Sequence, residues 1–172
     1  MVDEFDILIK NATIVDGVKK AFKGSIGIKD KRISAVGEMR GDANKVFDAT
    51  GLMAMPGFVD PHSHADGGLL FYPKAESAVR QGCTTVIAGQ CGESPAPLDE
   101  YIRPPRDLVD EIFKENPYLY YGSTLLSLDK VNDLMNEKYG WTINYRTMGE
   151  YFKQVKLKGT SINYMPIVGH GT

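Results

Sequence analysis

The pattern of apolar residues changes near residue 52, and this change constrains the fold more than any other feature of the sequence. Before it, short strand-like runs follow one another with turn residues between them. After it, apolar β-type runs alternate with helical segments, which is typical of βα units in a parallel sheet or barrel. We therefore predict an α/β chain, with a small β domain at 1–52 and the first strands and helices of a barrel at 53–172.

The first region contains short runs rich in apolar and β-branched residues, which we expect to be strands. They lie at 5–9, 12–15, 24–28, 32–36 and 45–48. Asp30 and Lys31 separate the third and fourth runs and predict a hairpin turn. We expect these strands to form part of a small β-sandwich.

The second region begins with a predicted strand at 57–60 and a helix at 73–81, which Pro73 opens and Gly82 ends. A strand rich in β-branched residues follows at 83–88. Thr147 and Glu150 form a capping-box signature for a helix that runs through Lys156 and turns Tyr151, Phe152 and Val155 inward. The remaining predicted elements are a helix at 106–115 and a strand at 162–168. Residues 118–126 fit either a third strand or a buried irregular segment.

Composition excludes several classes of protein. The 172 residues are 42% hydrophobic and carry a net charge of -2, so the chain can bury a core but has no basic surface for nucleic acid or a membrane. The acidic start lacks the pattern of a secretory signal, and no run is long enough to span a bilayer. We expect a cytoplasmic protein whose two cysteines stay reduced, with Cys83 in the core.

His62 and His64 are separated by one residue at the end of the apolar run 52–59. In an extended strand, residues i and i+2 point to the same face, so both imidazoles could converge on one cation. Neutral imidazole suits zinc and its neighbours. The alternative is that the two rings are satisfied by hydrogen bonds or lie exposed near a turn.

Three stretches carry a resemblance. Residues 49–64, ATGLMAMPGFVDPHSH, resemble the entry strand of the amidohydrolase superfamily, where a His-x-His pair ends the first barrel strand. Residues 81–94, QGCTTVIAGQCGES, resemble a more specific motif of the D-aminoacylase (N-acyl-D-amino-acid deacylase) family. Residues 162–172, INYMPIVGHGT, are similar to the middle of that family's sequence.

The resemblance implies a (β/α)₈ barrel of TIM type with a flanking β domain. It also implies zinc-dependent hydrolysis of the amide bond of N-acyl-D-amino acids, with one or two Zn²⁺ ions held by His62, His64 and Cys91. Without the motif, the simplest interpretation of Cys91 would be a small buried apolar residue. Gln90 stands where the family commonly has Asn, and Cys83 replaces a valine; both changes leave the substrate preference open.

Three further residues are candidates for contacts with substrate or with the metal ligands. Asp66 either supports a ligand or the substrate amine, or simply caps its loop. Ser94 matches a family serine, although a turn hydroxyl explains it equally. His170 either reaches the mouth of the site or lies in a solvated turn.

The length limits what the chain can do alone. A complete barrel needs about 250 residues, so this sequence holds only an N-terminal portion. The resemblance places two later histidine ligands and the general base, an aspartate, outside it. We expect a complementary C-terminal chain of a split or nicked enzyme to supply them, the alternative being an excised fragment. The rival functions are hydrolysis of cyclic amides, as in dihydropyrimidinases and hydantoinases, and a noncatalytic metal-binding half-barrel.

Overall fold

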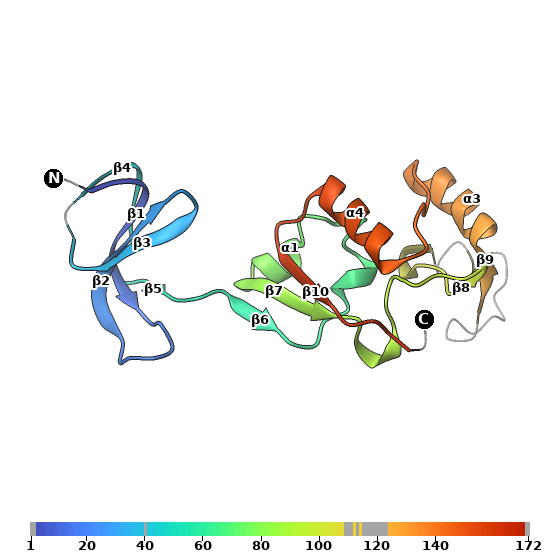
Figure 1. Cartoon of the computed structure of the whole chain (residues 1–172), viewed down its shortest axis with the longest axis horizontal. Coiled ribbons are helices and arrows are strands. Elements are labelled where there is room, and N and C mark those ends of the chain that lie inside the picture. The colour runs from blue at the N-terminus through green and yellow to red at the C-terminus, as the bar shows by residue number, and fades with distance from the viewer. Residues whose placement is uncertain (1–2, 40, 109–111, 113, 115–123, 171–172) are drawn as a thin grey trace. The chain divides into compact units, whose positions relative to one another are not determined.

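The computed structural model describes residues 3–39, 41–108, 112, 114 and 124–170. The chain divides into two compact units, Met1–Pro56 and Gly57–Thr172 (Figure 1). This division falls later than the predicted boundary near residue 52. The reason is that strand β5 (Met53–Ala54) pairs in parallel with the end of β1, so it belongs to the first unit.

The first unit is a five-stranded sheet. Its path runs β3-β2-β1-β4, with β5 paired to β1 off this path. The strands are β1 (Asp3–Ile14), β2 (Phe22–Lys29), β3 (Arg32–Gly37) and β4 (Gly41–Asp48). β2 is antiparallel to β1 and β3, whereas β4 and β5 run parallel to β1. Ala12, Ile14 and Ala49 form the buried cluster of this unit.

Strand β1 joins the two strands predicted at 5–9 and 12–15. A register shift between Ile9 and Ala12 absorbs Asn11, whose φ of 62° lies in the left-handed region. A bulge of this kind lets one strand continue past an extra residue. The predicted hairpin is confirmed: Asp30 and Lys31 have φ values of 50° and 61° between β2 and β3, as a two-residue turn with matching twist requires.

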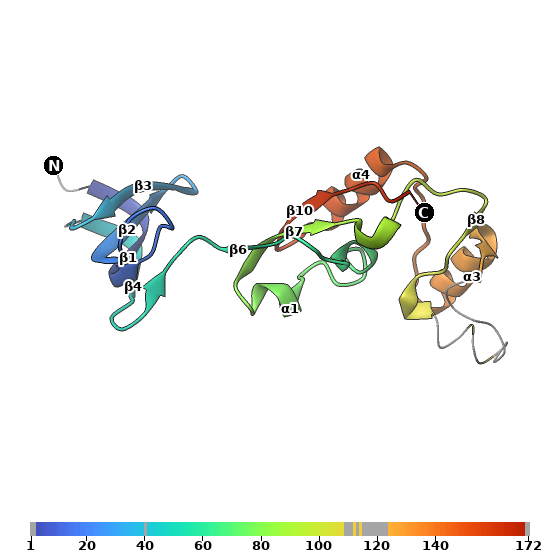
Figure 2. The same cartoon turned by 90° about the horizontal axis from the view of Figure 1, so that it is seen from below.

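The second unit is built on a parallel three-stranded sheet ordered β10-β7-β6 (Figure 2). Its strands are β6 (Phe58–Asp60), β7 (Cys83–Ala88) and β10 (Asn163–Pro166). Helices α1 (Glu76–Val79) and α4 (Met148–Lys158) lie on the same side of these strands in Figure 1. The predicted alternation of parallel strands and helices is confirmed for this unit.

Helix α1 is a single turn, much shorter than the helix predicted at 73–81. Ala75, just before it, has a φ of 44°, which is left-handed and cannot belong to an α-helix. Gly82 has a φ of 83° and marks the turn into β7, as predicted.

Between β7 and α4 the chain makes an excursion that sequence analysis read incorrectly. β8 (Tyr101–Ile102) and β9 (Leu126–Ser127) pair antiparallel, so Leu126 does not continue the parallel sheet as predicted. Of the helix predicted at 106–115, the structure describes a 3₁₀ turn, η3 (Arg106–Leu108), and the isolated residues 112 and 114. The rest of that helix, and 118–123 of the predicted third strand, lie outside the described residues.

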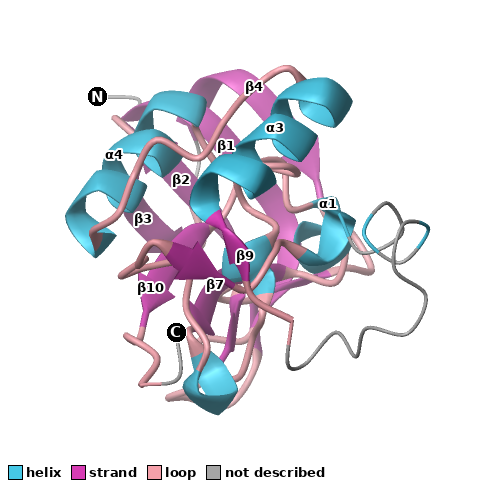
Figure 3. Ribbon diagram, turned by 90° about the vertical axis from the view of Figure 1, so that its right-hand side faces the viewer, coloured by secondary structure: helices cyan, strands magenta, loops and turns pink. Residues whose placement is uncertain are grey.

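Helix α3 (Leu128–Tyr139) follows β9 directly (Figure 3) and was not predicted. Ser127 caps its start by accepting a hydrogen bond from the Lys130 N–H (3.3 Å), and the left-handed Gly140 ends it. Both are ordinary helix-boundary signals. Its buried side chains, Leu128, Val131 and Met135, recur at i, i+3 and i+7, which is the spacing of one helix face. The sequence therefore carried a signal for this helix that the prediction missed.

Helix α4 begins as predicted. The Thr147 hydroxyl accepts from the Glu150 N–H (3.2 Å), and the Glu150 carboxylate accepts from the Thr147 N–H (2.9 Å). Tyr151 and Val155 are buried, but Phe152 is 39% exposed rather than inward-facing. Tyr151 and Val155 belong to the largest apolar cluster, which also contains Leu70, Ile102, Val131, Met135, Ile143 and Tyr145. No described helix is both long and apolar enough to cross a bilayer.

Replacing Thr147 by alanine removes the acceptor for the Glu150 N–H. We expect Thr147→Ala to lower the free energy of unfolding by about 1 kcal/mol, measured by urea denaturation. Thr147→Ser keeps the hydroxyl and should restore most of the loss. Equal destabilisation by both variants would contradict the role of the capping box.

Candidate metal centre

The candidate ligands lie at the carboxyl ends of two neighbouring strands. His62 and His64 follow β6, and Cys91 lies in the 3₁₀ turn η2 (Gln90–Gly92) that follows β7. Asp60 is in register with Val86 in two parallel strands, so the turns that follow them lie at the same edge of the sheet. The structure therefore brings together three side chains that are up to 29 residues apart in sequence.

The two histidines reach this position by a different route from the one predicted. β6 ends at Asp60, and residues 61–64 form a bend instead of continuing the strand. The rings of His62 and His64 are 5.7 Å apart between centroids and inclined at 60°. Their convergence depends on the bend and not on the alternation of side chains along a strand.

The three side chains form a group that could hold a metal ion, and the Cys91–His62 pair has the spacing of two zinc ligands. Their ligand atoms all lie within 4.8 Å of one another, and the Cys91 Sγ is 3.4 Å from the His62 Nε2. Two ligands of one tetrahedral zinc are roughly 3.3–3.7 Å apart, because Zn–N is about 2.0 Å and Zn–S about 2.3 Å. All three residues are exposed, which leaves room on the metal for further ligands. Two imidazoles and a thiolate are donors that zinc prefers.

Hydrogen bonds tie the histidine bend to the neighbouring strand. The Ser63 N–H donates to the Ile87 carbonyl (2.9 Å), and the His62 N–H donates to the Asp60 carboxylate (3.1 Å). The side-chain amide of Gln90 donates to the Pro61 carbonyl (3.0 Å). Gln90 therefore links the turn that carries Cys91 to the bend that carries the histidines.

The turn that carries Cys91 has an unusual backbone. Cys91 has a φ of 55°, which is uncommon for a residue with a side chain. Gly89 has a φ of 84°, and a Cβ there would overlap the Ile167 carbonyl. The Ile167 N–H in turn donates to the Ala88 carbonyl (2.7 Å), so the segment after β10 packs closely on this turn. Glycine is required at residue 89 for both reasons.

Asp66 lies in the 3₁₀ turn η1 (Ala65–Gly67) and is only 6% exposed. Its carboxylate accepts a hydrogen bond from the Gly89 N–H (3.0 Å), and its carbonyl accepts one from the Tyr151 hydroxyl (2.8 Å). Burial raises the pKa of the Asp66 carboxyl, while backbone N–H groups and His64 oppose that rise. Asp66 thus joins the histidine bend, the Cys91 turn and α4, which is more than a cap of its own loop.

The other two candidates occupy different environments. The Ser94 hydroxyl donates to the Ala96 carbonyl (2.6 Å) and accepts from the Gly169 N–H (3.0 Å), so it joins the segment after β7 to the segment after β10. His170 is exposed in a turn after β10 and is not among the clustered metal-type side chains.

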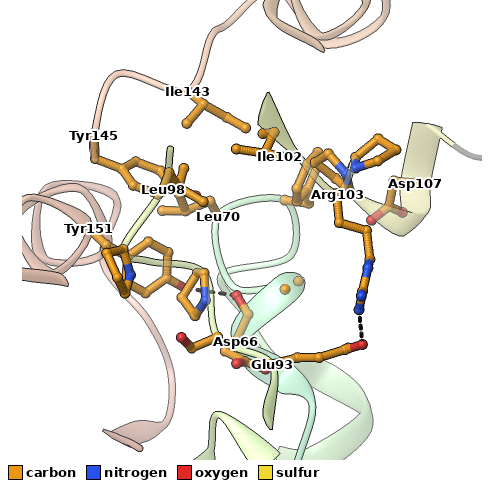
Figure 4. Close-up of a pocket in the computed structure, with 18 of the residues that line it drawn as sticks. Asp66, Leu70, Glu93, Leu98, Ile102, Arg103, Asp107, Ile143, Tyr145 and Tyr151 are labelled. Carbon is orange, nitrogen blue, oxygen red and sulfur yellow. Dashed lines mark hydrogen bonds and ion pairs between the residues drawn. The ribbon is translucent and has the colours of Figure 1, made fainter. Parts of the chain in front are cut away.

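A cavity of about 710 Å³ adjoins the histidine bend, and sequence analysis did not find it. His64, Asp66 and Leu70 line it from the sheet side, and the excursion between β7 and α4 supplies the opposite wall. Figure 4 shows its labelled lining side chains: Asp66, Leu70, Glu93, Leu98, Ile102, Arg103, Asp107, Ile143, Tyr145 and Tyr151. The excursion carries no metal-ligand motif and is rich in loop residues, so its sequence gave no sign of a binding wall.

Two curated relatives match nearly the whole chain. The chain is 31% identical to an N-acyl-D-aspartate deacylase of Alcaligenes xylosoxydans xylosoxydans, with 97% of this chain and 28% of the relative covered. It is 29% identical to a D-aminoacylase of the same organism, with 98% of this chain and 30% of the relative covered. An Escherichia coli allantoinase is 37% identical over 55% of this chain and 22% of its own length. The chain spans less than a third of the length of these relatives.

Solved structures agree with this likeness. A D-aminoacylase studied for its binuclear metal centre matches with a TM-score of 0.71 and 26% identity, over 96% of this chain and 30% of that one. A second match is the N-acyl-D-glutamate deacylase of Bordetella bronchiseptica, solved with zinc and a phosphonate inhibitor. Its TM-score is 0.68 and its identity 28%, over 98% of this chain and 30% of that one.

The sequence model of the Amidohydrolase family matches residues 45–154, which include the histidine bend, the Cys91 turn and most of the cavity wall. The family match, the relatives and the fold thus agree on the segment that holds the clustered candidate ligands. The chain belongs to the amidohydrolase family.

Proposed function

We propose that the chain contributes to zinc-dependent hydrolysis of the amide bond of N-acyl-D-amino acids. The observation that carries this proposal is the clustering of His62, His64 and Cys91 within 4.8 Å at the carboxyl end of a parallel sheet. In barrels of this type the carboxyl ends of the strands carry the catalytic groups. The similarity to enzymes named as N-acyl-D-amino-acid deacylases supports the choice of substrate.

His62, His64 and Cys91 would hold the metal in this proposal. A zinc ion bound there supplies a Lewis acid for the acyl carbonyl and lowers the pKa of a bound water. The exposed Cys91 thiol lies beside two imidazoles, and a thiol that ligates a cation does so as the thiolate. Asp66 and Gln90 fix the position of Cys91 relative to the histidines, because each bonds across from one turn to the other.

The proposal requires groups from outside this sequence. A general base must take a proton from the attacking water, and we propose that a complementary amidohydrolase chain brings it together with the remaining metal ligands. The three-stranded sheet supports this, because β6 and β10 are both edge strands in the described unit. Unpaired edges of this kind invite further strands.

The face of the sheet opposite the helices also supports completion by further strands. Met165 is in register with Ile87, and Val59 with Thr85, so these side chains share one face. Met165 is 57% exposed and Val59 is 56% exposed. On the other face, Val86 packs with Leu69 and Ile162 and is 1% exposed. Side chains from the missing strands would cover the first face, as the interior layers of a barrel do.

Hydrolysis of a cyclic amide is the second candidate. The allantoinase relative favours it, because its identity of 37% over 100 residues is higher than that of the deacylases, although it covers less of the chain. Product analysis with N-acyl-D-amino acids and cyclic imides in parallel separates the two reactions. Zinc binding without turnover of either class would instead indicate a noncatalytic half-barrel.

Cys91→Ala should remove the thiolate from the ligand set. Loss of a hydrogen bond that only supports a metal ligand lowers metal affinity about 10–100-fold. Because Cys91 is itself a proposed ligand, we expect zinc affinity to fall by more than that. We also expect the completed enzyme to lose amide hydrolysis. Zinc content after dialysis against a chelator measures the first effect. Cys83→Ala is the matched control, since Cys83 packs beside the core of the second unit. Equal zinc content in both variants would show that Cys91 is not a zinc ligand.

Gln90→Leu keeps the size of the side chain but removes the donor to the Pro61 carbonyl. We expect zinc affinity to fall about 10–100-fold, because the Cys91 turn loses its tether to the histidine bend. Gln81→Leu is the matched control, since the Gln81 amide also donates to a backbone carbonyl, that of Ser77 (2.8 Å), away from the ligands. A zinc affinity for Gln90→Leu equal to that of Gln81→Leu would show that this tether does not position the ligands.

The completion proposal can be tested by co-expression. Alone, the chain should be poorly soluble or inactive, and co-expression with the missing portion of a D-aminoacylase-type sequence should restore hydrolysis. Met165→Asp should prevent that rescue by placing a charge on the uncovered face, whereas Val18→Asp, at a site 87% exposed in the first unit, should not. Full activity of the isolated chain would refute the need for a complementary chain.

A further inference from the structure

The cavity beside the histidine bend has an apolar wall that the proposed metal chemistry does not use. Leu70, Ile102, Ile143 and Tyr145 are each less than 9% exposed and belong to the largest apolar cluster. Leu98 completes this wall, and its backbone N–H is held by the Arg146 carbonyl (2.8 Å). His64 lines the same cavity, so the apolar wall and the candidate metal site share one space.

Charge determines which half of an N-acyl amino acid suits this space. The lining includes Asp66, Glu93, Asp99 and Asp107, against one cationic side chain among the described lining residues, Arg103. The Arg103 guanidinium forms an ion pair with Glu93 (Figure 4), so these two charges offset each other and the carboxylates of Asp66, Asp99 and Asp107 remain. The amino-acid half of the substrate carries a carboxylate, which these groups would repel. The uncharged acyl half meets no such penalty.

We propose that this cavity is the binding pocket for the acyl group of the substrate, and that it selects acyl chains longer than acetyl. The proposal rests on the proposed function, since it assumes an N-acyl amino acid. The acyl chain is bonded directly to the carbon that is attacked at the metal site, so it must lie next to His64. A volume of about 710 Å³ is that of a pocket for a ligand much larger than an acetyl group. Each methylene buried there should raise kcat/KM about fourfold.

Binding can be measured without turnover or metal. Trp141 is the single tryptophan of the chain and lines the cavity, so its fluorescence reports on an occupant. We expect octanamide to change the emission saturably in the chain copurified with its complementary portion, while acetamide at the same concentration does not. Trp141→Phe should abolish the change. Leu98→Phe narrows the cavity and should weaken octanamide binding at least tenfold. Leu52→Phe, at a residue 62% exposed in the first unit and absent from the lining of this cavity, is the matched control.

If Leu98→Phe does not fold, Leu125→Phe narrows the same cavity from its rim, where Leu125 is 60% exposed. The proposal would be overturned if octanamide did not change the emission. It would also be overturned if neither Leu98→Phe nor Leu125→Phe weakened octanamide binding. Octanamide binding in a protein that hydrolyses no amide would refute the proposed function and leave the apolar pocket standing, so the two failures are distinguishable.

Turnover by the completed enzyme separates the acyl group from the amino-acid side chain. Leu98→Phe should lower kcat/KM for N-octanoyl-D-alanine relative to N-acetyl-D-alanine at least tenfold. It should leave the ratio between N-acetyl-D-leucine and N-acetyl-D-alanine unchanged. A change in the second ratio instead of the first would assign the cavity to the side chain and overturn the acyl assignment.

Discussion

Parallel pairing of β6 with β7 is the constraint on which the candidate site depends. Neighbouring parallel strands end at the same edge of the sheet, so the turns that follow β6 and β7 both lie at that edge. The histidine bend and the Cys91 turn are therefore neighbours in space although 29 residues separate His62 from Cys91. β10 extends the arrangement, since the chain that follows it packs on the Cys91 turn at Gly89.

Strand pairing alone brings the turns near one another, and polar contacts between turns fix their geometry. The carboxylate of Asp66 and the amide of Gln90 each bond from one turn to the backbone of another. Burial raises the pKa of the Asp66 carboxyl, and hydrogen bonds from backbone N–H groups offset part of that cost of desolvation. Removing one such contact should displace a ligand without unfolding the sheet, which separates effects on the metal from effects on stability.

The excursion between β7 and α4 has a different role from the sheet. It contributes no candidate ligand, yet α3 and the β8–β9 pair bury a large apolar cluster and present one side of it to the space beside His64. A barrel strand sets where the chemistry occurs, and the loops beyond it set what fits there. This division explains how one family can hold similar ligands and act on different amides.

The sequence by itself determined the βα alternation, the capping of α4, the hairpin at Asp30 and Lys31, and the choice of candidate ligands, because these depend on local periodicity and on side-chain chemistry. Only the tertiary structure decided that the histidines converge through a bend, that Asp66 and Gln90 bond across turns, and that the excursion encloses a cavity. Those features depend on contacts between residues far apart in the chain, whose partners no local pattern specifies.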